Sequence, residues 1–313
     1  MKILITGVHG FVGSNLVKAL SKDNTIYGLD IISPLKEGIR FTFGWDNLDD
    51  GQIPDVDAII HLAGKAHDTK NQAAADVYFK VNTELTKKVF DYFLAHESIK
   101  KFVFFSTAKA AADKVDGILT EEVVPSPVGP YGESKIAAEK YILANTDFTN
   151  CTDKHVYIFR PCMIHGPGNK GNLNLLYNVV KKGIPWPLGA FENRRTFTSI
   201  ENICFAVNGV LTKDVPSGIY NMGDDEALST NELIEEICKS LGKKAHIWKL
   251  PKGLMNGAAK VGRLLHLPLN PERLRKLTEN YVSSNAKIKK ALGVEKMPVD
   301  AREGLKVTLN SFK

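Results

Sequence analysis

Short apolar runs alternate with stretches of helical periodicity through the first half of the chain. Each run is bounded by polar residues or glycine, which is typical of a strand buried on both faces of a sheet. Strands are predicted in this way at Lys2–Thr6, Thr25–Asp30, Ala58–Leu62, Phe102–Ser106 and His155–Arg160, and helices at Phe11–Ser21, Asn82–His96 and Ser134–Asn145. Strands that alternate with helices predict a parallel sheet with crossover helices.

The character of the sequence changes after Arg160. The segment PCMIHGPGNKGN is rich in glycine and proline, and the regular alternation stops there. We therefore predict an α/β fold with a doubly wound Rossmann domain over residues 1–165 and a smaller mixed α/β domain over residues 166–313, some segments of which can return to the first domain. Helices of the second part are predicted at Leu173–Lys182, Thr230–Leu241 and Pro271–Lys276, and strands at Arg195–Ser199 and Gly218–Met222. Without a long linker between them, the two domains are expected to enclose a cleft.

A glycine-rich turn directly follows the first predicted strand, in the sequence TGVHGFVG. Glycines permit a tight turn and a close backbone approach, and the free amides at the start of the next helix suit a pyrophosphate. Asp30 ends the second strand, where a carboxylate can accept hydrogen bonds from an adenosine ribose and repel a 2′-phosphate. We therefore predict that NAD, rather than NADP, binds at Gly7, Gly10, Phe11, Val12, Gly13 and Asp30.

Tyr131 and Lys135 form a YxxxK pair at the start of a predicted helix, so that both side chains project from one face. The ammonium group, together with a positively charged nicotinamide, would lower the pKa of the tyrosine and let it exchange a proton with a substrate hydroxyl. Lys135 also suits the nicotinamide ribose as a hydrogen-bond donor. Ser106 and Thr107 end the preceding strand. Thr107 is predicted to share the proton network with Tyr131, and Ser106 to face the cofactor.

The order of these motifs resembles the short-chain dehydrogenase/reductase superfamily. The glycine spacing GVHGFVG, the segment HLAG after a strand, and YxxxK one loop after the serine and threonine carry this resemblance. It implies that hydride transfer to the nicotinamide accompanies proton transfer by the tyrosine. It also implies that Leu62, Ala63, Gly64, Ser106, Tyr131, Lys135 and Pro161 line the cofactor.

The chain is similar over nearly its whole length to the extended branch of this superfamily, the nucleotide-sugar epimerases, dehydratases and reductases. The similarity rests on VNT at Val81–Thr83, RPCMIHGPG at Arg160–Gly168, and RRTFTSIENI at Arg194–Ile203. It implies that a nucleotide-diphosphate sugar, UDP-linked, is the substrate and that a homodimer forms through two helices of the first domain.

The same resemblance implies which residues bind the diphosphate. By position these are Asn172 with Leu173 and Arg195, with Arg273 or Arg275 as a second phosphate contact. An arginine fork suits such oxygens because it can bind two of them at once. Thr107 is expected to contact the sugar.

Departures from the family pattern narrow the reaction. Dehydratases follow the catalytic threonine with an Asp-Glu pair, whereas Ala108 and Lys109 stand here, so dehydration is not expected. Ala110–Ala112 and Met163 replace the VYG and the active-site asparagine of many epimerases, which favours reduction. Asp30 favours a retained NAD, and therefore epimerisation.

The favoured prediction is an NAD-dependent epimerase acting at carbon four of a UDP-hexose or a UDP-N-acetylhexosamine. The alternative is an NAD(P)H-dependent reductase of a UDP-4-keto-6-deoxy-hexosamine in surface polysaccharide biosynthesis. An alternative of another class is a non-catalytic protein that binds a dinucleotide. The presence of Thr107, Tyr131 and Lys135 together argues against it.

Composition excludes several other classes. A chain of 313 residues with 43% hydrophobic and 24% charged content is an ordinary globular protein, and it has no apolar stretch near the roughly 20 residues of a membrane-spanning helix. The cysteines Cys151, Cys162, Cys204 and Cys238 share no CxxC spacing, so neither a metal site nor a disulfide framework is expected. Since MKILITG runs into the glycine turn rather than into a signal-peptide core, we expect a cytoplasmic location.

The net charge of +6 comes without a dense basic block, so nucleic-acid binding is not expected. The segment Lys252–His266 is mildly basic and amphipathic. Such a pattern favours a helix of the second domain. Contact with a membrane surface or a partner is the alternative interpretation of this segment.

Overall fold

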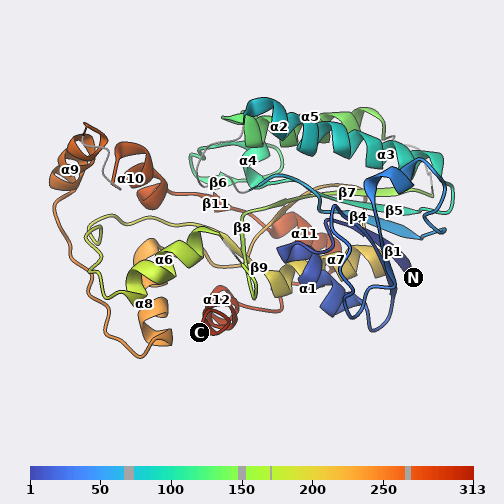
Figure 1. Cartoon of the computed structure of the whole chain (residues 1–313). Helices are drawn as coiled ribbons and strands as arrows, with labels where there is room; N and C mark the ends of the chain where they lie inside the picture. The colour runs from blue at the N-terminus through green and yellow to red at the C-terminus, as the bar shows by residue number, and fades with distance from the viewer. Residues whose placement is uncertain (67–73, 147–152, 170, 265–268) are drawn as a thin grey trace.

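A seven-stranded parallel sheet lies at the centre of the molecule (Figure 1). The structure, a computed structural model, describes residues 1–66, 74–146, 153–169, 171–264 and 269–313. The strands of the sheet are β1 (Lys2–Thr6), β2 (Thr25–Leu29), β3 (Phe41–Phe43), β4 (Ala58–His61), β5 (Lys101–Phe105), β7 (His155–Pro161) and β10 (Gly218–Met222), in the order β10-β7-β5-β4-β1-β2-β3. The chain moves outward from β1 first to one side and then to the other. This order confirms the predicted doubly wound fold, in which ligands bind beyond the carboxyl ends of the strands where the direction reverses.

Helices cover both faces of the sheet because successive side chains of each strand point to opposite faces. Ile3 and Ile5 belong to one core cluster, and Leu4 belongs to the other. The first face is covered by α1 (Phe11–Leu20), α7 (Ile200–Thr212) and α11 (Ala286–Leu292), and the second by α2 (Ala75–Phe79), α3 (Leu85–Ala95) and α5 (Pro130–Ala144). The strands read as continuous apolar runs because both of their faces are buried.

The predicted strands and helices of the first half are present, with ends that differ by a few residues. The helix predicted at Asn82–His96 differs most, because a turn of π-helix at Lys80–Glu84 joins α2 to α3. Single π turns inside α-helices are frequent at functional sites. Two short helices that the sequence did not predict, a 3-10 helix at Trp45–Leu48 and α4 (Ala108–Ala111), lie in the loops after β3 and β5.

A smaller lobe lies to one side of the sheet and has its own apolar core (Figure 1). Its elements are α6 (Asn172–Lys181), α8 (Thr230–Ser240), α9 (Lys252–Leu264), α10 (Pro271–Thr278) and α12 (Ala301–Asn310), with β8 (Met163–His165) paired to β9 (Phe197–Ser199). Helix α9 matches the helix predicted in Lys252–His266, although residues 265–268 lie outside the described ranges. The capping box at Ser229 and Glu232 explains where α8 begins.

Segments from beyond residue 165 return to the central sheet. The strand at Gly218–Met222, predicted as part of the second domain, is instead the edge strand β10 and pairs in parallel with β7. Likewise, β11 (Val282–Ser283) pairs with β6 (Ile118–Leu119). The chain therefore crosses between the sheet and the lobe several times, which fixes the lobe beside the carboxyl ends of the strands.

The structure also bears on the cysteines and on membrane insertion. Cys162, Cys204 and Cys238 are free thiols, whereas Cys151 lies outside the described residues. In the described part of the chain, no helix combines the length and the apolar character needed to cross a bilayer. No cluster of three or more metal-ligating side chains occurs among the residues that the structure describes.

Candidate active site

The glycine turn between β1 and α1 is a close-packed bend. Gly7 has a φ of 66°, a value that favours glycine, and its amide donates to the carbonyl oxygen of Leu29 at 2.8 Å. A Cβ atom at Gly13 would lie 2.5 Å from the carbonyl oxygen of Gly7. Gly10 caps α1 without a side chain, so the first amides of the helix have no side-chain acceptor there. This cradle fits the pyrophosphate of the predicted dinucleotide.

Asp30 follows β2 and braces the glycine turn from the neighbouring strand. One carboxylate oxygen accepts the amide of His9 at 3.0 Å, and the other accepts the amide of Ile31 at 2.7 Å. A carboxylate has about four acceptor positions. Asp30 therefore has capacity for further hydrogen bonds beside the turn, as the predicted contact with a ribose requires.

A buried chain of hydrogen bonds orients the loop after β4, and the sequence analysis missed it. Thr6 accepts the amides of Leu62 and Ala63 at 3.1 and 3.0 Å. Its hydroxyl also lies 2.7 Å from Nδ1 of His61, whose Nε2 lies 2.9 Å from the hydroxyl of Thr86. Each of these polar groups has a hydrogen-bond partner inside the sheet, and the bonds fix the backbone of Leu62 and Ala63 directly after β4.

The hydrogen-bond pattern assigns a neutral tautomer to His61. The hydroxyl of Thr86 donates to a backbone carbonyl, and therefore accepts the Nε2–H of His61. Thr6 is then left to donate to Nδ1. Burial lowers the pKa of His61 to about 3, and the charge of Lys135 acts in the same direction. His61 is therefore a neutral structural link, with no proton to exchange at ordinary pH.

Asn82, to which the sequence analysis gave no role in the site, connects that same loop to helix α5. From the π turn, its side chain accepts the amide of Lys65 at 2.7 Å and donates to the carbonyl oxygen of Lys65 at 3.1 Å. It also donates to the hydroxyl of Ser134 at 3.0 Å. A buried polar residue inside a helical pattern was the signal that could have found it.

Lys135 lies at the junction of β5, α5 and the loop after β4. Its ammonium donates to the carbonyl oxygen of Phe105 at 2.8 Å, and a Cβ atom at Gly64 would lie 3.1 Å from its Nζ. Burial lowers the pKa of Lys135 to about 8, although the charge of Glu139 acts in the opposite direction. The structure thus brings Lys135 close to Gly64, and both residues were predicted to line the cofactor.

Thr107 and Tyr131 meet at the same edge of the sheet. Their side chains are hydrogen-bonded, and Thr107 also caps α4 by accepting the amide of Lys109 at 3.3 Å. Burial raises the pKa of Tyr131, and the hydrogen bond with Thr107 acts in the opposite direction. The sequence analysis expected Lys135 to lower this pKa, but the ammonium is directed at Phe105 instead. The tyrosine is therefore a protonated phenol at neutral pH in this structure.

The side chain of Ser106 does not face the predicted cofactor position. Its hydroxyl donates to Glu139 of α5, whose carboxylate binds Arg160 of β7 at 3.0 and 3.1 Å through Nε. All three residues are buried. Ser106 therefore belongs to a structural ion pair beneath the site, and the prediction for its hydroxyl is corrected. Pro161, the next predicted contact, ends β7 at the carboxyl edge of the sheet.

The residues predicted to bind the diphosphate lie on the smaller lobe. Asn172 is the exposed first residue of α6, whereas the side chain of Leu173 is 2% exposed and belongs to the lobe core. Of the predicted contact between Leu173 and the diphosphate, only a contact through the main chain therefore remains possible. Arg195 precedes β9, and its guanidinium donates to the carbonyl oxygen of Lys276 in α10. The charge of Arg195 acts on the thiol of Cys162, which directly follows β7, so Arg195 lies across from the strand ends.

Further basic residues surround Asp113, between α4 and the lobe. Lys109 binds one oxygen of Asp113 at 2.7 Å, and Arg275 of α10 lies 3.7 Å from the other. Arg275 also lies 3.9 Å from Glu279. Lys109, which replaces the acid of dehydratases, is thereby held beside Asp113, which also lies close to Arg275 of α10.

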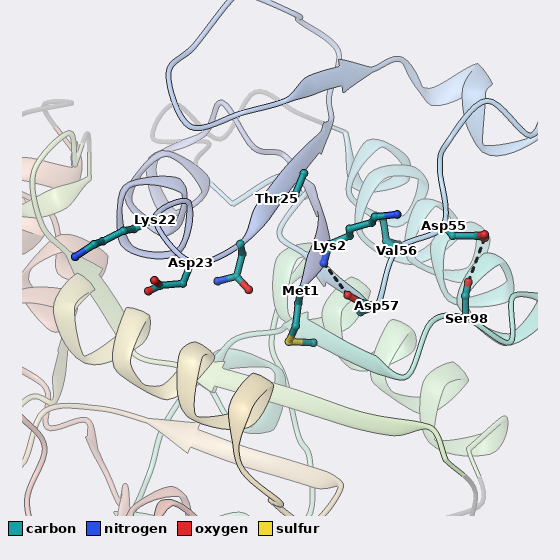
Figure 2. A pocket seen from close by; sticks show the side chains of 10 residues that line it. Met1, Lys2, Lys22, Asp23, Thr25, Asp55, Val56, Asp57 and Ser98 are labelled. Atoms are coloured by element: carbon teal, nitrogen blue, oxygen red, sulfur yellow. Dashed lines mark hydrogen bonds between the residues drawn. The ribbon is translucent and has the colours of Figure 1, made fainter.

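A surface pocket of about 490 Å³ lies at the opposite edge of the sheet, away from these residues. Figure 2 shows Met1, Lys2 and Thr25 around it, at the amino ends of β1 and β2, with the amide of Lys2 donating to Asp57 at 2.7 Å. Parallel α/β sheets bind their ligands beyond the carboxyl ends of the strands. This pocket is therefore not the candidate active site.

Known proteins resemble the chain in both sequence and fold. The NAD dependent epimerase/dehydratase family matches residues 3–223. The UDP-glucose 4-epimerase of Vibrio cholerae is 32% identical over 267 residues, covering 80% of this chain and 78% of that protein. An Escherichia coli protein, the N-acetyl-alpha-D-glucosaminyl-diphospho-ditrans,octacis-undecaprenol 4-epimerase, is 28% identical and covers 82% of this chain and 77% of its own length.

The fold is that of the UDP-glucuronic acid 4-epimerase from Bacillus cereus, solved in complex with NAD. The two structures have a TM-score of 0.75 at 21% identity, covering 100% of this chain and 98% of that one. This likeness confirms the predicted fold. The sequence matches confirm the predicted family, the enzyme class and NAD as its cofactor. The chain belongs to the NAD dependent epimerase/dehydratase family.

Proposed function

We propose that this enzyme interconverts epimers at carbon four of a UDP-hexose or a UDP-N-acetylhexosamine. One observation carries the proposal: the hydrogen-bonded hydroxyl pair of Thr107 and Tyr131 lies at the carboxyl edge of the sheet, on the same helix as the buried Lys135. The relative from Vibrio cholerae, named a UDP-glucose 4-epimerase, supports the same reaction and the same class of sugar.

In this proposal, side chains of the protein accept and return the proton of the sugar hydroxyl. NAD, when bound, supplies reversible hydride exchange with carbon four. Tyr131, as the phenolate, would accept the proton of the hydroxyl on that carbon and later return it, while Thr107 holds the oxygen by a hydrogen bond. Both hydride and proton return to the sugar, so there is no net oxidation. Because burial raises the pKa of Tyr131, the phenolate requires positive charge nearby, which the nicotinamide of bound NAD together with Lys135 on the same helix would supply.

The diphosphate is held by the smaller lobe while the sugar presents either face. Arg195 is anchored to α10 through the carbonyl oxygen of Lys276, which supports a fixed cation across from the strand ends. Asn172 and the main chain of Leu173 start α6, so they offer amide donors at the helix terminus to the same diphosphate. Because these contacts involve only the diphosphate, the sugar itself would be free to rotate.

A second candidate is a reductase of a UDP-4-keto-6-deoxy-hexosamine in surface polysaccharide biosynthesis. Met163 of β8 favours it, because an asparagine stands there in many epimerases and a thioether offers a retained keto sugar no hydrogen bond. Met163 is partly buried against the core of the lobe. In this reaction Tyr131 would donate its proton to the keto oxygen, using the same three residues.

One experiment separates the two reactions. The purified chain is assayed for co-purifying dinucleotide, and then incubated with UDP-glucose, UDP-N-acetylglucosamine and a UDP-4-keto-6-deoxy sugar. Bound NAD with interconversion of epimers supports the epimerase. Net consumption of NADH or NADPH with the keto sugar alone rejects the epimerase in favour of the reductase.

A pair of variants on one helix tests the assignment of the proton carrier. Tyr131→Phe is expected to lower kcat by about 10²- to 10⁴-fold while NAD binding is retained. Tyr141→Phe is the matched control, since the hydroxyl of Tyr141 lies on the same helix and donates to Asp91 at 2.6 Å. Full activity of Tyr131→Phe would overturn the assignment.

We also propose that the enzyme is a cytoplasmic homodimer that associates through two helices of the first domain, as the family resemblance implies. A monomer has a mass of 34.5 kDa, so light scattering distinguishes the two states directly. A single species at the monomer mass would reject the dimer.

A further inference from the structure

Helix α9 exposes apolar side chains on the side that faces away from the protein. Its buried residues are Met255, Ala259 and Gly262, which pack into the lobe. Leu254, Val261 and Leu264 are 60%, 53% and 79% exposed. Leu254 and Val261 are two turns apart and lie on one side of the helix, with Leu264 nearly a turn further along. The helix thus has two apolar sides, of which the lobe covers one.

The sequence has no dense basic block, but its net positive charge arises in the segment around this helix. Residues 241–270 contain six Lys or Arg residues and no Asp or Glu. Since the net charge of the whole chain is +6, the rest of the chain has equal numbers of basic and acidic residues. Lys260 and Arg263 of α9 are also exposed. By helical spacing Lys260 lies next to Leu264, and Arg263 lies on the flank away from Leu254 and Val261.

Helix α9 lies at the outer end of the lobe, next to α10 (Figure 1). The carbonyl oxygen of Lys276, in α10, accepts the guanidinium of Arg195. The outer side of α9 is therefore exposed at the extremity of the molecule. A partner bound to α9 would lie close to the part of the lobe that carries Arg195.

The combination of exposed apolar and basic side chains fits one kind of partner better than others. A nucleic acid would bind the cations but would leave the leucine and valine side chains in water. A second copy of the chain would cover the apolar side chains but would bring two positive segments together. An anionic lipid surface accepts both, because apolar side chains enter the acyl boundary while the basic ones meet lipid phosphates.

We propose that α9 docks this enzyme on the surface of an anionic lipid bilayer. Leu254, Val261 and Leu264 enter the interface between headgroups and acyl chains, and Lys260 and Arg263 bind lipid phosphates. The helix lies in the plane of the surface, since 13 residues are too few to span a bilayer. This docking is independent of the reaction at carbon four.

The test is sedimentation of the full chain with vesicles of phosphatidylcholine and phosphatidylglycerol in a ratio of three to one. The wild type is expected to sediment with these vesicles, more weakly as salt is added, and not with phosphatidylcholine alone. Leu254→Gln/Val261→Gln and Lys260→Glu/Arg263→Glu are each expected to weaken binding by about ten-fold or more.

A matched control comes from another exposed helix. Lys306 and Val307 of α12 are both exposed, so Lys306→Glu/Val307→Gln makes the same kinds of change elsewhere. It is expected to bind vesicles like the wild type. Far-ultraviolet circular dichroism confirms that each variant is folded.

Three outcomes would overturn the proposal. The first is a wild type that does not sediment with anionic vesicles. The second is equal vesicle binding by the α9 variants and the control, and the third is a loss with the charge variant alone, which would identify a general polyanion surface. If light scattering also shows that Leu254→Gln/Val261→Gln converts a dimer to a monomer without any vesicle binding, the occupant of α9 is a second copy of the chain.

Discussion

The ammonium group of Lys135 lies 2.8 Å from the main-chain carbonyl oxygen of Phe105, at the end of β5. This contact ties the start of α5 to the strand that precedes Thr107. The lysine is buried, and burial lowers its pKa to about 8. The cation that the proposed reaction requires is therefore held at a cost in folding free energy, and that cost depends on pH.

Replacement of Lys135 by methionine should expose this cost. In the folded protein its pKa of about 8 lies below the unfolded value of about 10.4, so the unfolded state holds more protons between these two pH values. The unfolding free energy of the wild type therefore increases as pH rises from about 8 to about 10.4, because the cost of burying the charged lysine falls. Between pH 7.5 and pH 10, the unfolding free energy of the wild type should rise by about 2 kcal/mol relative to Lys135→Met.

Urea unfolding at the two pH values measures this difference. Lys140→Met is the control, because Lys140 is an exposed lysine on the same helix. If the difference in unfolding free energy between wild type and Lys135→Met does not change with pH, the buried lysine is not the source of the pH-dependent stability.

Acid should act on the hydrogen-bond chain through His61. The folded pKa of about 3 lies below the unfolded value of about 6.5, so the unfolded state takes up the proton first as pH falls. The stability contributed by the neutral ring is complete above pH 6.5 and is lost as pH falls toward 3. From pH 7 to pH 5, the advantage of the wild type over His61→Gln should shrink by about 2 kcal/mol.

The comparison uses chemical unfolding at both pH values, with His246→Gln as a control because His246 is exposed. The result expected for the control is a difference from wild type that stays constant. If His61→Gln behaves in the same way, the neutral tautomer assigned to His61 is wrong.

The outcomes for individual residues show what local sequence could predict. Local spacing was enough to predict that Tyr131 and Lys135 lie on one helix, four residues apart and therefore on one face. The glycine turn was equally local. The direction of the Ser106 hydroxyl could not be predicted from local sequence, because it depends on Glu139 from a helix and Arg160 from another strand.

The smaller lobe illustrates the same limit at the level of elements. The apolar run at Gly218–Met222 predicted a strand correctly, but nothing in the run itself says that it pairs with β7. Leu173 was assigned by position to the substrate, whereas packing against the lobe core decides where its side chain lies. The sequence predicts such elements, and long-range contacts decide their partners.

The buried ion pair of Arg160 and Glu139 should be costly to break from one side. The side chains are 2% and 0% exposed, so either residue alone would be a charge without its partner in the interior. Glu139→Gln is expected to lower the unfolding free energy by about 3–5 kcal/mol. The double variant Glu139→Leu/Arg160→Met removes both charges and should recover much of that loss.

Urea unfolding of Glu139→Leu, Arg160→Met and the double variant forms a double-mutant cycle. Lys88→Met serves as the surface control, since the pair of Lys88 and Asp49 is solvent-exposed and should contribute less than about 1 kcal/mol. If the cycle gives no coupling free energy between Glu139 and Arg160, their ion pair does not stabilise the two buried charges.

Gly13 offers the sharpest test of the cofactor cradle, because its replacement by alanine adds a single methyl group. That carbon would lie 2.5 Å from the carbonyl oxygen of Gly7 and 2.7 Å from that of Val8, so the turn must shift. Gly13→Ala is expected to destabilise the fold by about 1–3 kcal/mol and to weaken NAD binding by about ten-fold or more. Gly257→Ala is the matched control.

At Gly257, a position inside helix α9, a Cβ atom would meet no atom within 4 Å. Alanine there should stabilise the fold by about 0.5–1 kcal/mol, since glycine loses more backbone entropy than alanine in a helix. Thermal unfolding and calorimetric titration with NAD measure both effects in each variant. If Gly13→Ala binds NAD as tightly as Gly257→Ala does, the close approach of backbone to pyrophosphate at this turn is refuted.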